Sequence, residues 1–241
     1  MLLRFENAAA AMSTLQQNQE RVANNLANAN TTGYKRDRFF TEAFNERLDA
    51  ERSPRSDRRT RQTSDMSQGA LKQTENPLDV ALGGDGFFVT RPEGGDATHY
   101  TRAGHFSVGQ DGTLRTSDGK QVLGEGGAIQ VPVDEQGDIN IAKDGTITLG
   151  DDQIGKLRVA SVDNPAQLER REGTSFVAGD ATPRRMDDPT VLQGMVEKSN
   201  VSPVEEMTDM IQTSRQYGAQ QRSLQATNEI LSRATQDLGK L

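Results

Sequence analysis

The chain has 241 residues, a formal net charge of −7 and no cysteine. The acidic balance argues against a general nucleic-acid binder, and the absence of cysteine excludes disulfides, thiolate metal sites and cysteine nucleophiles. Hydrophobic residues make up 33% of the sequence, mean hydropathy is −0.73 and tryptophan is absent. This composition is lean for a compact enzyme and typical of an elongated or assembly-forming protein.

We expect neither a secretory signal nor direct membrane insertion. Arg4 and Glu6 interrupt the N-terminal stretch too early for a signal peptide. No apolar run approaches the roughly 18 residues that a spanning helix needs. If the protein leaves the cytoplasm, we therefore expect export without a cleaved signal.

Residues 3–29 predict a helix, because apolar side chains recur there at heptad-like intervals. These positions are Ala8, Met12, Leu15, Val22 and Leu26, with Gln19 in the one remaining slot. The pattern stops in the asparagine-rich stretch 24–33, where asparagine tolerates left-handed backbone geometry and Gly33 can cap the helix end. Residues 1–33 are therefore expected to form the first structural segment.

Residues 34–70 are interpreted as a polar linker with a short apolar turn at Phe39, Phe40 and Phe44. The stretch 45–66 is rich in arginine, but acidic residues are interspersed and aromatic residues are missing. An RNA-binding patch would combine its cations with aromatic side chains. A solvated linker that orders on assembly is the better interpretation.

Residues 71–178 have the pattern of an antiparallel β-domain, with short β-branched and aromatic runs between turn signals. Asp111-Gly112-Thr113-Leu114 and Asp144-Gly145-Thr146-Ile147 predict the same hairpin corner twice. Gly83-Gly84-Asp85-Gly86 predicts a tight bend, because it lacks the residues of a phosphate-binding loop and precedes a strand. Only this region is expected to form an independent core.

Residues 179–201 predict a second linker, and residues 202–241 predict a long helix with Ser202 as its N-cap. Apolar residues recur in that helix at seven-residue intervals, at Met210, Tyr217, Leu224, Leu231 and Leu238. The neighbouring track is polar and consists of Ser214, Gln221, Asn228 and Thr235. So thin a stripe needs a partner helix. The expected fold is α+β, with the N- and C-terminal helices pairing as a coiled coil and a central antiparallel β-domain.

No pattern of catalytic or metal-binding residues is evident. His99 and His105 lie in the β-region without a third ligand at a supporting spacing. A nucleophile elbow and a calcium loop are both missing. We expect no catalytic residue, no metal, no cofactor and no enzyme activity.

Four stretches resemble the flagellar rod and hook family, in the family's order. They are Asn24–Lys35, Gln68–Phe88, Tyr100–Gly112 and Ser199–Tyr217. The chain has no room for the large outer domain of the hook protein, and Pro203-Val204-Glu205-Glu206-Met207 is most similar to the proximal rod protein. The distal rod protein is the alternative.

The resemblance implies a rod subunit of the basal body that spans the periplasm and transmits torque for motility. Its partners would be proximal and distal rod subunits and the flagellar type III export apparatus, with no nucleic acid. The assembly interface expected from the helical stripes and the family signatures consists of Ala8, Met12, Leu15, Val22, Asn24, Asn25, Leu26, Asn28, Asn30, Gly33, Val204, Met207, Met210, Ile211, Tyr217, Leu224, Leu231 and Leu238.

Two other classes remain as alternatives. A ligand-binding or enzymatic β-domain would carry a convergent polar pocket within residues 71–177. A nucleic-acid binder would act through the arginines of residues 47–61, in salt-sensitive binding that their replacement would abolish.

Overall fold

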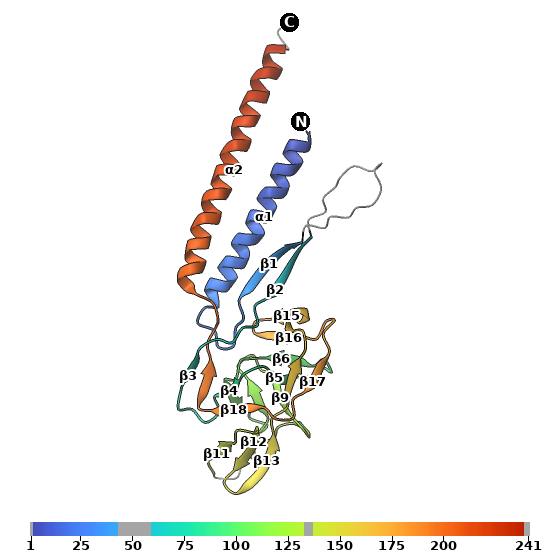
Figure 1. Cartoon of the computed structure of the whole chain (residues 1–241), viewed down its shortest axis with the longest axis vertical. Helices are drawn as coiled ribbons and strands as arrows, with labels where there is room; N and C mark the ends of the chain where they lie inside the picture. Colours follow the sequence, from blue (N-terminus) through green and yellow to red (C-terminus); the bar gives the residue numbers. More distant parts are fainter. Residues whose placement is uncertain (1, 43–58, 133–136, 239–241) are drawn as a thin grey trace. The chain divides into compact units, whose positions relative to one another are not determined.

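The computed structural model describes residues 2–42, 59–132 and 137–238, with side chains described over 7–39, 63–132 and 137–229. It divides into two compact units (Figure 1). Unit 1 contains residues 1–27 and 201–241, and unit 2 contains residues 28–200. None of the described helices combines the length and apolar character that a bilayer crossing requires.

Unit 1 is a pair of helices, α1 (Leu2–Ala27) and α2 (Pro203–Leu238), which pack against each other. Val22 of α1 is fully buried, and Met12 and Leu15 are half-buried. The helix expected at residues 3–29 is confirmed and ends at Ala27. The long C-terminal helix is confirmed as well.

The inward face of α2 differs from the expected one, because different residues form the second, polar track beside the apolar stripe. Buried and half-buried positions recur at a four-three spacing, at Glu206, Met210, Thr213, Tyr217, Gln220 and Leu224. Ser214, Gln221 and Asn228 are exposed instead, so these three expected members were wrong. The side chain of the fourth, Thr235, lies outside the described ones.

The contacts with α1 explain this difference. On a helix, residues three and four apart both neighbour a given side chain, and the rotation against the partner decides which of them turns inward. Here the Asn18 amide of α1 donates to Thr213 Oγ1 at 3.2 Å, and the expected slot residue Gln19 is exposed. Position 213 rather than 214 therefore faces α1.

Unit 2 is built from short strands, and every described strand pairing is antiparallel (Figure 1). The strands are β1 (Asp37–Glu42), β2 (Arg59–Ser64), β3 (Leu71–Gln73), β4 (Val80–Gly83), β5 (Phe87–Arg91), β6 (His99–Thr101), β7 (Phe106–Val108), β8 (Leu114–Thr116), β9 (Gln121–Gly124), β10 (Gly127–Ala128), β11 (Ile139–Ile141), β12 (Thr146–Leu149), β13 (Asp152–Lys156), β14 (Val159–Val162), β15 (Glu169–Glu172), β16 (Ser175–Val177), β17 (Pro183–Arg185), β18 (Thr190–Gln193) and β19 (Met195–Glu197), with the 3-10 turn η1 (Pro165–Gln167) before β15. The main sheet has the order β15-β16-β6-β5-β9-β8-β7, and β14 also pairs with β5. The central antiparallel β-domain is thus confirmed.

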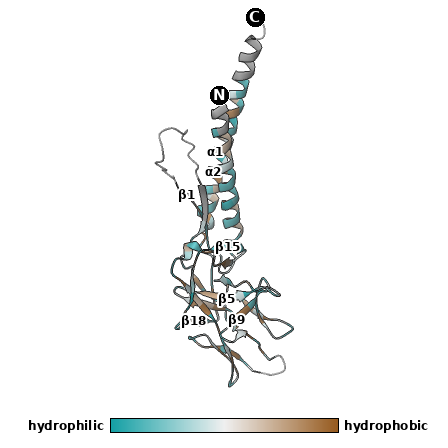
Figure 2. Ribbon diagram, turned by 90° about the vertical axis from the view of Figure 1, so that its right-hand side faces the viewer, coloured by the Kyte–Doolittle hydropathy of each residue, from teal (hydrophilic) through white to brown (hydrophobic). Residues whose placement is uncertain are grey.

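Strand β5 supplies side chains to both hydrophobic clusters of unit 2. Successive residues of a strand point to opposite faces of its sheet. Phe88 meets Phe106 edge to face at 5.1 Å in one cluster, and Phe87 meets Phe176 at 6.4 Å in the other. Figure 2 shows hydrophobic residues gathered along these strands, whereas the helices are mostly hydrophilic.

Both segments that we expected to be linkers contain paired strands. In the first, β1 pairs with β2 from Asp37↔Ser64 to Glu42↔Arg59. Phe39 and Phe40 lie in β1 rather than in a turn, and Phe44 lies outside the described residues. In the second, β18 pairs with β4 and β19 pairs with β3. These last strand partners lie more than 100 residues apart in the sequence, so no local pattern could reveal their pairing.

The hairpin corner expected twice is confirmed in atomic detail. The Asp111 carboxylate accepts hydrogen bonds from the Thr113 amide at 3.2 Å and from Thr113 Oγ1 at 2.7 Å. Asp144 accepts the equivalent bonds from Thr146 at 3.1 and 2.8 Å. These bonds lower the pKa of both carboxyl groups. A short polar side chain two residues before the bonded amide is what closes such a turn.

Candidate assembly interface

An apolar stripe on α2 is uncovered in the folded chain. Val204, Met207 and Ile211 are 74%, 51% and 54% exposed. Their spacing of three and four residues places them on one face of the helix. Leu71 is the other large hydrophobic residue exposed within the described part of the chain. A cluster of exposed apolar side chains marks a surface for contact with another protein.

The interface between α1 and α2 is short of apolar side chains. Among the described side chains of unit 1, Val22 and Val201 are the buried apolar ones, whereas Asn25, Glu206 and Thr213 are buried and polar. This composition agrees with the thin stripe inferred from the sequence. Apolar burial contributes most of the stability of packed helices, so the described part of this pair contributes little stability.

A polar layer crosses the helix pair where α1 approaches its end and α2 begins. Arg21 Nη1 approaches Glu206 Oε2 at 3.8 Å, and Glu206 is fully buried. The Arg21 guanidinium also donates to Asn18 Oδ1 at 3.1 and 2.8 Å. A buried ion pair contributes little net stability, because its desolvation offsets the attraction.

The structure divides the expected interface residues among several environments. In unit 1, Ala8, Met12, Leu15, Leu26, Met210, Tyr217 and Leu224 are half-buried, Val22 and Asn25 are buried, and Asn24, Val204, Met207 and Ile211 are exposed. In unit 2, Asn28 is half-buried, Asn30 is exposed and Gly33 is buried. The side chains of Leu231 and Leu238 lie outside the described residues. The candidate outer contact is therefore the exposed stripe of α2.

Gly33 has a structural part within unit 2 that the sequence did not reveal. Its amide donates to the Glu197 carbonyl at 2.7 Å. Its backbone φ is +69°, and a Cβ at this position would lie 2.2 Å from the Ala103 nitrogen. The glycine is needed for this close approach, whereas its expected part as the cap of the first helix was wrong, because α1 already ends at Ala27.

A buried ionic cluster next to Gly33 was missed by the sequence reasoning. Lys35, Arg102 and Glu197 are 1%, 3% and 1% exposed. Glu197 Oε1 accepts from Lys35 Nζ at 2.5 Å, and Oε2 accepts from Arg102 Nη1 at 3.2 Å. Burial lowers the pKa of Lys35 and of Arg102, and the Glu197 carboxylate opposes both shifts. Lys35 and Arg102 fall inside two of the family-like stretches, which was the one available signal.

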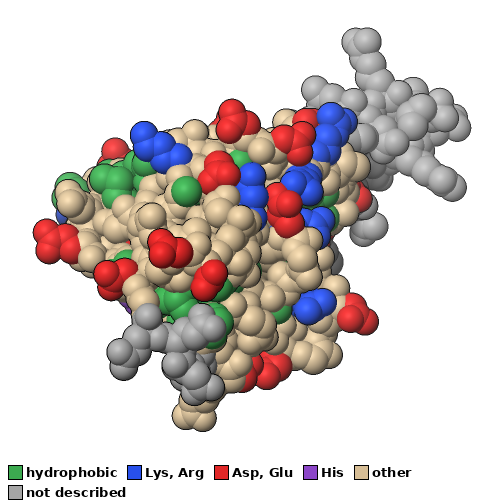
Figure 3. All heavy atoms as spheres, turned by 90° about the horizontal axis from the view of Figure 1, so that it is seen from below, with side chains coloured by type: hydrophobic (Ala, Val, Ile, Leu, Met, Phe, Trp, Pro, Cys, Tyr) green, Lys and Arg blue, Asp and Glu red, His purple; other side chains and the backbone are tan. Residues whose placement is uncertain are grey.

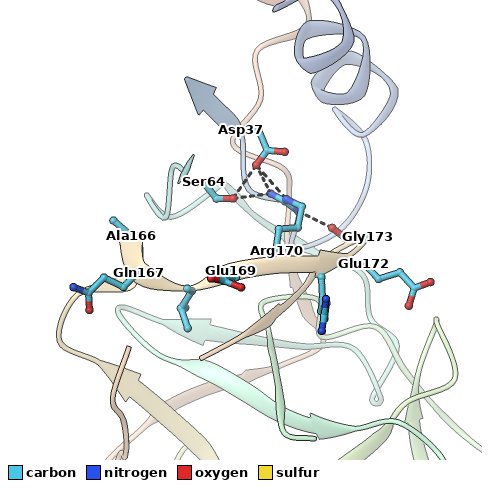
Figure 4. Close-up of a pocket in the computed structure, with 10 residues that line it drawn as sticks. Asp37, Ser64, Ala166, Gln167, Glu169, Arg170, Glu172 and Gly173 are labelled. Carbon is cyan, nitrogen blue, oxygen red and sulfur yellow. Dashed lines mark hydrogen bonds and ion pairs between the residues drawn. The ribbon is translucent and has the colours of Figure 1, made fainter. Parts of the chain in front are cut away.

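Arg170 anchors the base of the β1–β2 hairpin. Its guanidinium lies 4.4 Å from the Tyr34 ring centre and 4.9 Å from that of Phe176. Its Nε donates to Asp37 Oδ1 at 3.1 Å, and its Nη1 donates to the Gly173 carbonyl at 2.6 Å (Figure 4). Stacking on two rings together with ion pairing holds this side chain in one orientation.

A cavity of about 460 Å³ lies beside Arg170 and is lined by residues of β15, by the turns on either side of that strand, and by Asp37 and Ser64. Its central charged groups are already engaged, because Asp37 accepts from both Arg170 and Ser64. The Ser64 hydroxyl donates to Asp37 Oδ1 at 2.8 Å, but Arg170 forms an ion pair with the same oxygen, which makes this carboxylate a poor base. This arrangement favours a structural anchor over a ligand or catalytic site.

Charge on the described surface of unit 2 is mixed. Figure 3 shows acidic and basic side chains interspersed over the face seen from below. A nucleic-acid-binding surface would gather cations on one face. The arginines of residues 47–61, on which the nucleic-acid alternative depends, have side chains outside the described ones, so the mixed charge of this face does not test that alternative.

Neither histidine lies in a metal site of the described residues, which contain no group of three or more potential ligands. His105 Nδ1 lies 2.5 Å from Asp79 Oδ1. His99 is 8% exposed, and its Nδ1 has no hydrogen-bond partner. Burial, followed by the Lys120 charge, lowers the pKa of His99.

His99 is expected to make the stability of unit 2 depend on pH. Because its folded-state pKa lies below 6.5, the unfolded chain binds more protons as the pH falls through about 6.5. The free energy of unfolding should therefore decrease between about pH 7.5 and pH 5.5. Urea midpoints across this range should show a smaller decrease in His99→Gln. An unchanged pH dependence in this variant would contradict the assignment.

Taken together, a helix pair with a sparse apolar interface, an uncovered apolar stripe and a β-unit define a structural subunit that assembles with other chains. Three family models match this chain: "Flagella basal body rod protein" at residues 5–35, "Flagellar hook protein FlgE/F/G D1 domain" at 81–149 and "Flagellar basal body rod FlgEFG protein C-terminal" at 192–237. The matches cover both helices and the middle of unit 2.

Curated relatives extend the similarity over the whole length. The flagellar basal-body rod protein FlgF of Caulobacter vibrioides is 31% identical, over 95% of this chain and 94% of its own length. FlgF of Salmonella typhimurium is 37% identical over 94% of each chain. The rod protein FlgG of Agrobacterium fabrum is 35% identical over 96% of this chain and 97% of its own. The chain belongs to the flagellar basal-body rod protein family, whose members are structural, non-enzymatic subunits. This membership implies a place in the flagellar basal body and association with other rod subunits.

Proposed function

We propose that this chain is the proximal rod subunit, that α1 and α2 pair as a coiled coil, and that the pair packs against neighbouring subunits in the rod. The observation that carries this proposal is the stripe of Val204, Met207 and Ile211, which is exposed in the single chain. A stripe that meets a different surface of the next copy gives an interface that does not close on itself and builds a helical array. The other residues of the expected interface, including Leu231 and Leu238, belong to the same proposal.

Sequence identity supports the proximal position. FlgF of Salmonella typhimurium is 37% identical to this chain and FlgF of Escherichia coli is 34% identical, whereas FlgG of Agrobacterium fabrum is 35% and FlgG of Bacillus subtilis 30% identical. Alignment length does not separate the two, because it is 251 residues for FlgF of Salmonella typhimurium and 248 residues for FlgG of Buchnera aphidicola. The distal rod is the second candidate, favoured by the 35% identity to FlgG of Agrobacterium fabrum. The position of labelled subunits in imaged rods separates the two.

The weak helix pair suits a subunit that is exported before it assembles. We propose export through the flagellar type III apparatus without signal cleavage, with the helices becoming stable only when docked in the rod. Helices that bury few apolar side chains have little to hold them together in a free subunit. This would limit premature polymerisation.

The double variant Val204→Asp/Met207→Asp is expected to abolish incorporation into rods and motility. Two carboxylates on the docking stripe would have to be desolvated in the interface. Unit 2 should remain folded, because neither residue belongs to it. Motility on soft agar and subunit content of isolated basal bodies measure the effect.

The matched control is Gln212→Asp/Gln216→Asp, which adds the same charge to exposed positions of the same helix. It should assemble and support motility. Normal motility in the stripe variant would contradict the proposed interface. Loss of motility in both variants would show that charge on α2 matters rather than the stripe.

A further inference from the structure

Glu197 joins three distant segments of unit 2. Its Oε1 accepts hydrogen bonds from Lys35 Nζ at 2.5 Å and from the Gly69 amide at 3.0 Å. Its Oε2 accepts from Arg102 Nη1 at 3.2 Å. The carboxylate is therefore both a crosslink between segments and the counterion of two cations.

Glu197 is the one carboxylate in direct contact with the two cations among the described residues, whereas Asp65 attracts Lys35 and Asp85 attracts Arg102 from farther away. Lys35 also donates to the Ser67 carbonyl at 2.7 Å. Arg102 donates to the Gly84 carbonyl at 2.8 Å and lies 5.0 Å from the Phe87 ring centre. Among the described residues, Glu197 is the carboxylate within 4 Å of either cation. Buried charges are tolerated only when paired, and removing one partner leaves the other uncompensated.

Along the chain, the counterion of this cluster comes after both of its cations. The two cations come at positions 35 and 102, whereas their counterion comes at 197, three residues before unit 2 ends. A chain that lacks Glu197 would have to bury both cations without it in order to complete its core. Lys35 and Arg102 would then oppose folding until the last strand arrives.

We propose that unit 2 cannot complete its fold until Glu197 is available to neutralise the buried Lys35 and Arg102. The unit would then fold only after nearly all of its sequence has been made. The buried cations keep the incomplete chain open, and Glu197 removes that barrier. A chain emerging N-terminus first from the ribosome would stay unfolded until residue 197 is free. This inference does not depend on the position of the subunit in the rod.

The first test separates the missing charge from the missing strand, because a chain without Glu197 also lacks part of β19. Chains would be stalled on the ribosome at two lengths, so that residues up to 196 or up to 210 have emerged from it. Wild type is compared with the charge-free variant Lys35→Met/Arg102→Met/Glu197→Gln. With residues up to 196 exposed, wild type should be cleaved by protease at least about tenfold faster than the variant, because only its cations are uncompensated. With residues up to 210 exposed, both should be resistant.

Each other outcome overturns the proposal. If both short chains are sensitive, the missing strand controls folding. If both short chains are resistant, Glu197 is not needed for closure. If the charge-free variant stays sensitive at the longer length, the cluster acts through its hydrogen bonds rather than through charge balance.

The second test uses the released full-length protein at equilibrium. Glu197→Gln should lower the folded-to-unfolded ratio by about 10²- to 10³-fold, since two buried cations lose their counterion. Adding Lys35→Met and Arg102→Met should restore the ratio to within about tenfold of wild type. The matched control is Glu125→Gln at the exposed Arg185–Glu125 pair, where about a threefold change is expected. Failure of the two methionines to rescue Glu197→Gln would overturn the proposal.

Discussion

Gly33→Ala is expected to destabilise unit 2 by more than about 3 kcal/mol, because two separate costs combine at this position. The φ of Gly33 is +69°, a region that L side chains rarely adopt. The added Cβ would lie 2.2 Å from the Ala103 nitrogen and 2.4 Å from the Arg102 carbonyl carbon, both backbone atoms. Backbone cannot rotate away as a side chain would. Urea unfolding with hydrogen exchange at the β5 amides measures the loss.

Gly94→Ala is the matched control for the backbone cost alone. Gly94 has a φ of +72°, and nothing lies within 4 Å of its added Cβ. Its substitution should cost about 1–2 kcal/mol. Equal losses at the two positions would show that Gly33 matters only for its backbone conformation. A stable Gly33→Ala protein that fails to enter rods would instead assign Gly33 to the assembly surface.

Phe88→Ala is the second large effect, with an expected loss of about 3–5 kcal/mol in the free energy of unfolding of unit 2. Phe88 is fully buried in the central strand β5 and packs edge to face on Phe106 at 5.1 Å. Removing the ring loses its apolar burial and leaves a cavity that a paired sheet cannot collapse to fill. The urea midpoint should fall without a change in the denaturant slope.

Leu71→Ala is the control for this substitution, because Leu71 is 37% exposed. Its replacement should change the free energy of unfolding by at most about 0.5 kcal/mol. Phe88→Leu should lie between the two. A loss at Phe88 as small as that at Leu71 would show that the cluster around β5 is not the core of unit 2.

Local sequence patterns were sufficient for the helices and the tight turns. The seven-residue recurrence of Met210, Tyr217 and Leu224 predicted the stripe of α2 that turns inward. The repeated Asp-Gly-Thr motif predicted both hairpin corners, because the bonds that close them run between residues two positions apart. Patterns of this kind depend on neighbours in the chain, so the sequence shows them directly.

The sequence named the residues of the exposed α2 stripe without showing which way they point. The sequence analysis named Val204, Met207 and Ile211 but did not show that they face away from α1. Met210 and Tyr217, named in the same analysis, face toward α1. Contacts with α1, such as the hydrogen bond from Asn18 to Thr213, determine which face of α2 points inward. Those contacts join residues 195 positions apart.

By itself the sequence determined that this chain has two terminal helices and a strand-rich middle. It also determined that the apolar stripe of the C-terminal helix is too narrow to stabilise that helix without a partner. These features depend on periodicity and turn chemistry, which are local. Tertiary structure decided the rest. It placed strands in both supposed linkers and gathered Lys35, Arg102 and Glu197 into one buried cluster. Strand pairing and the desolvation of charge depend on residues that meet only in the folded chain, so no stretch of sequence could show them.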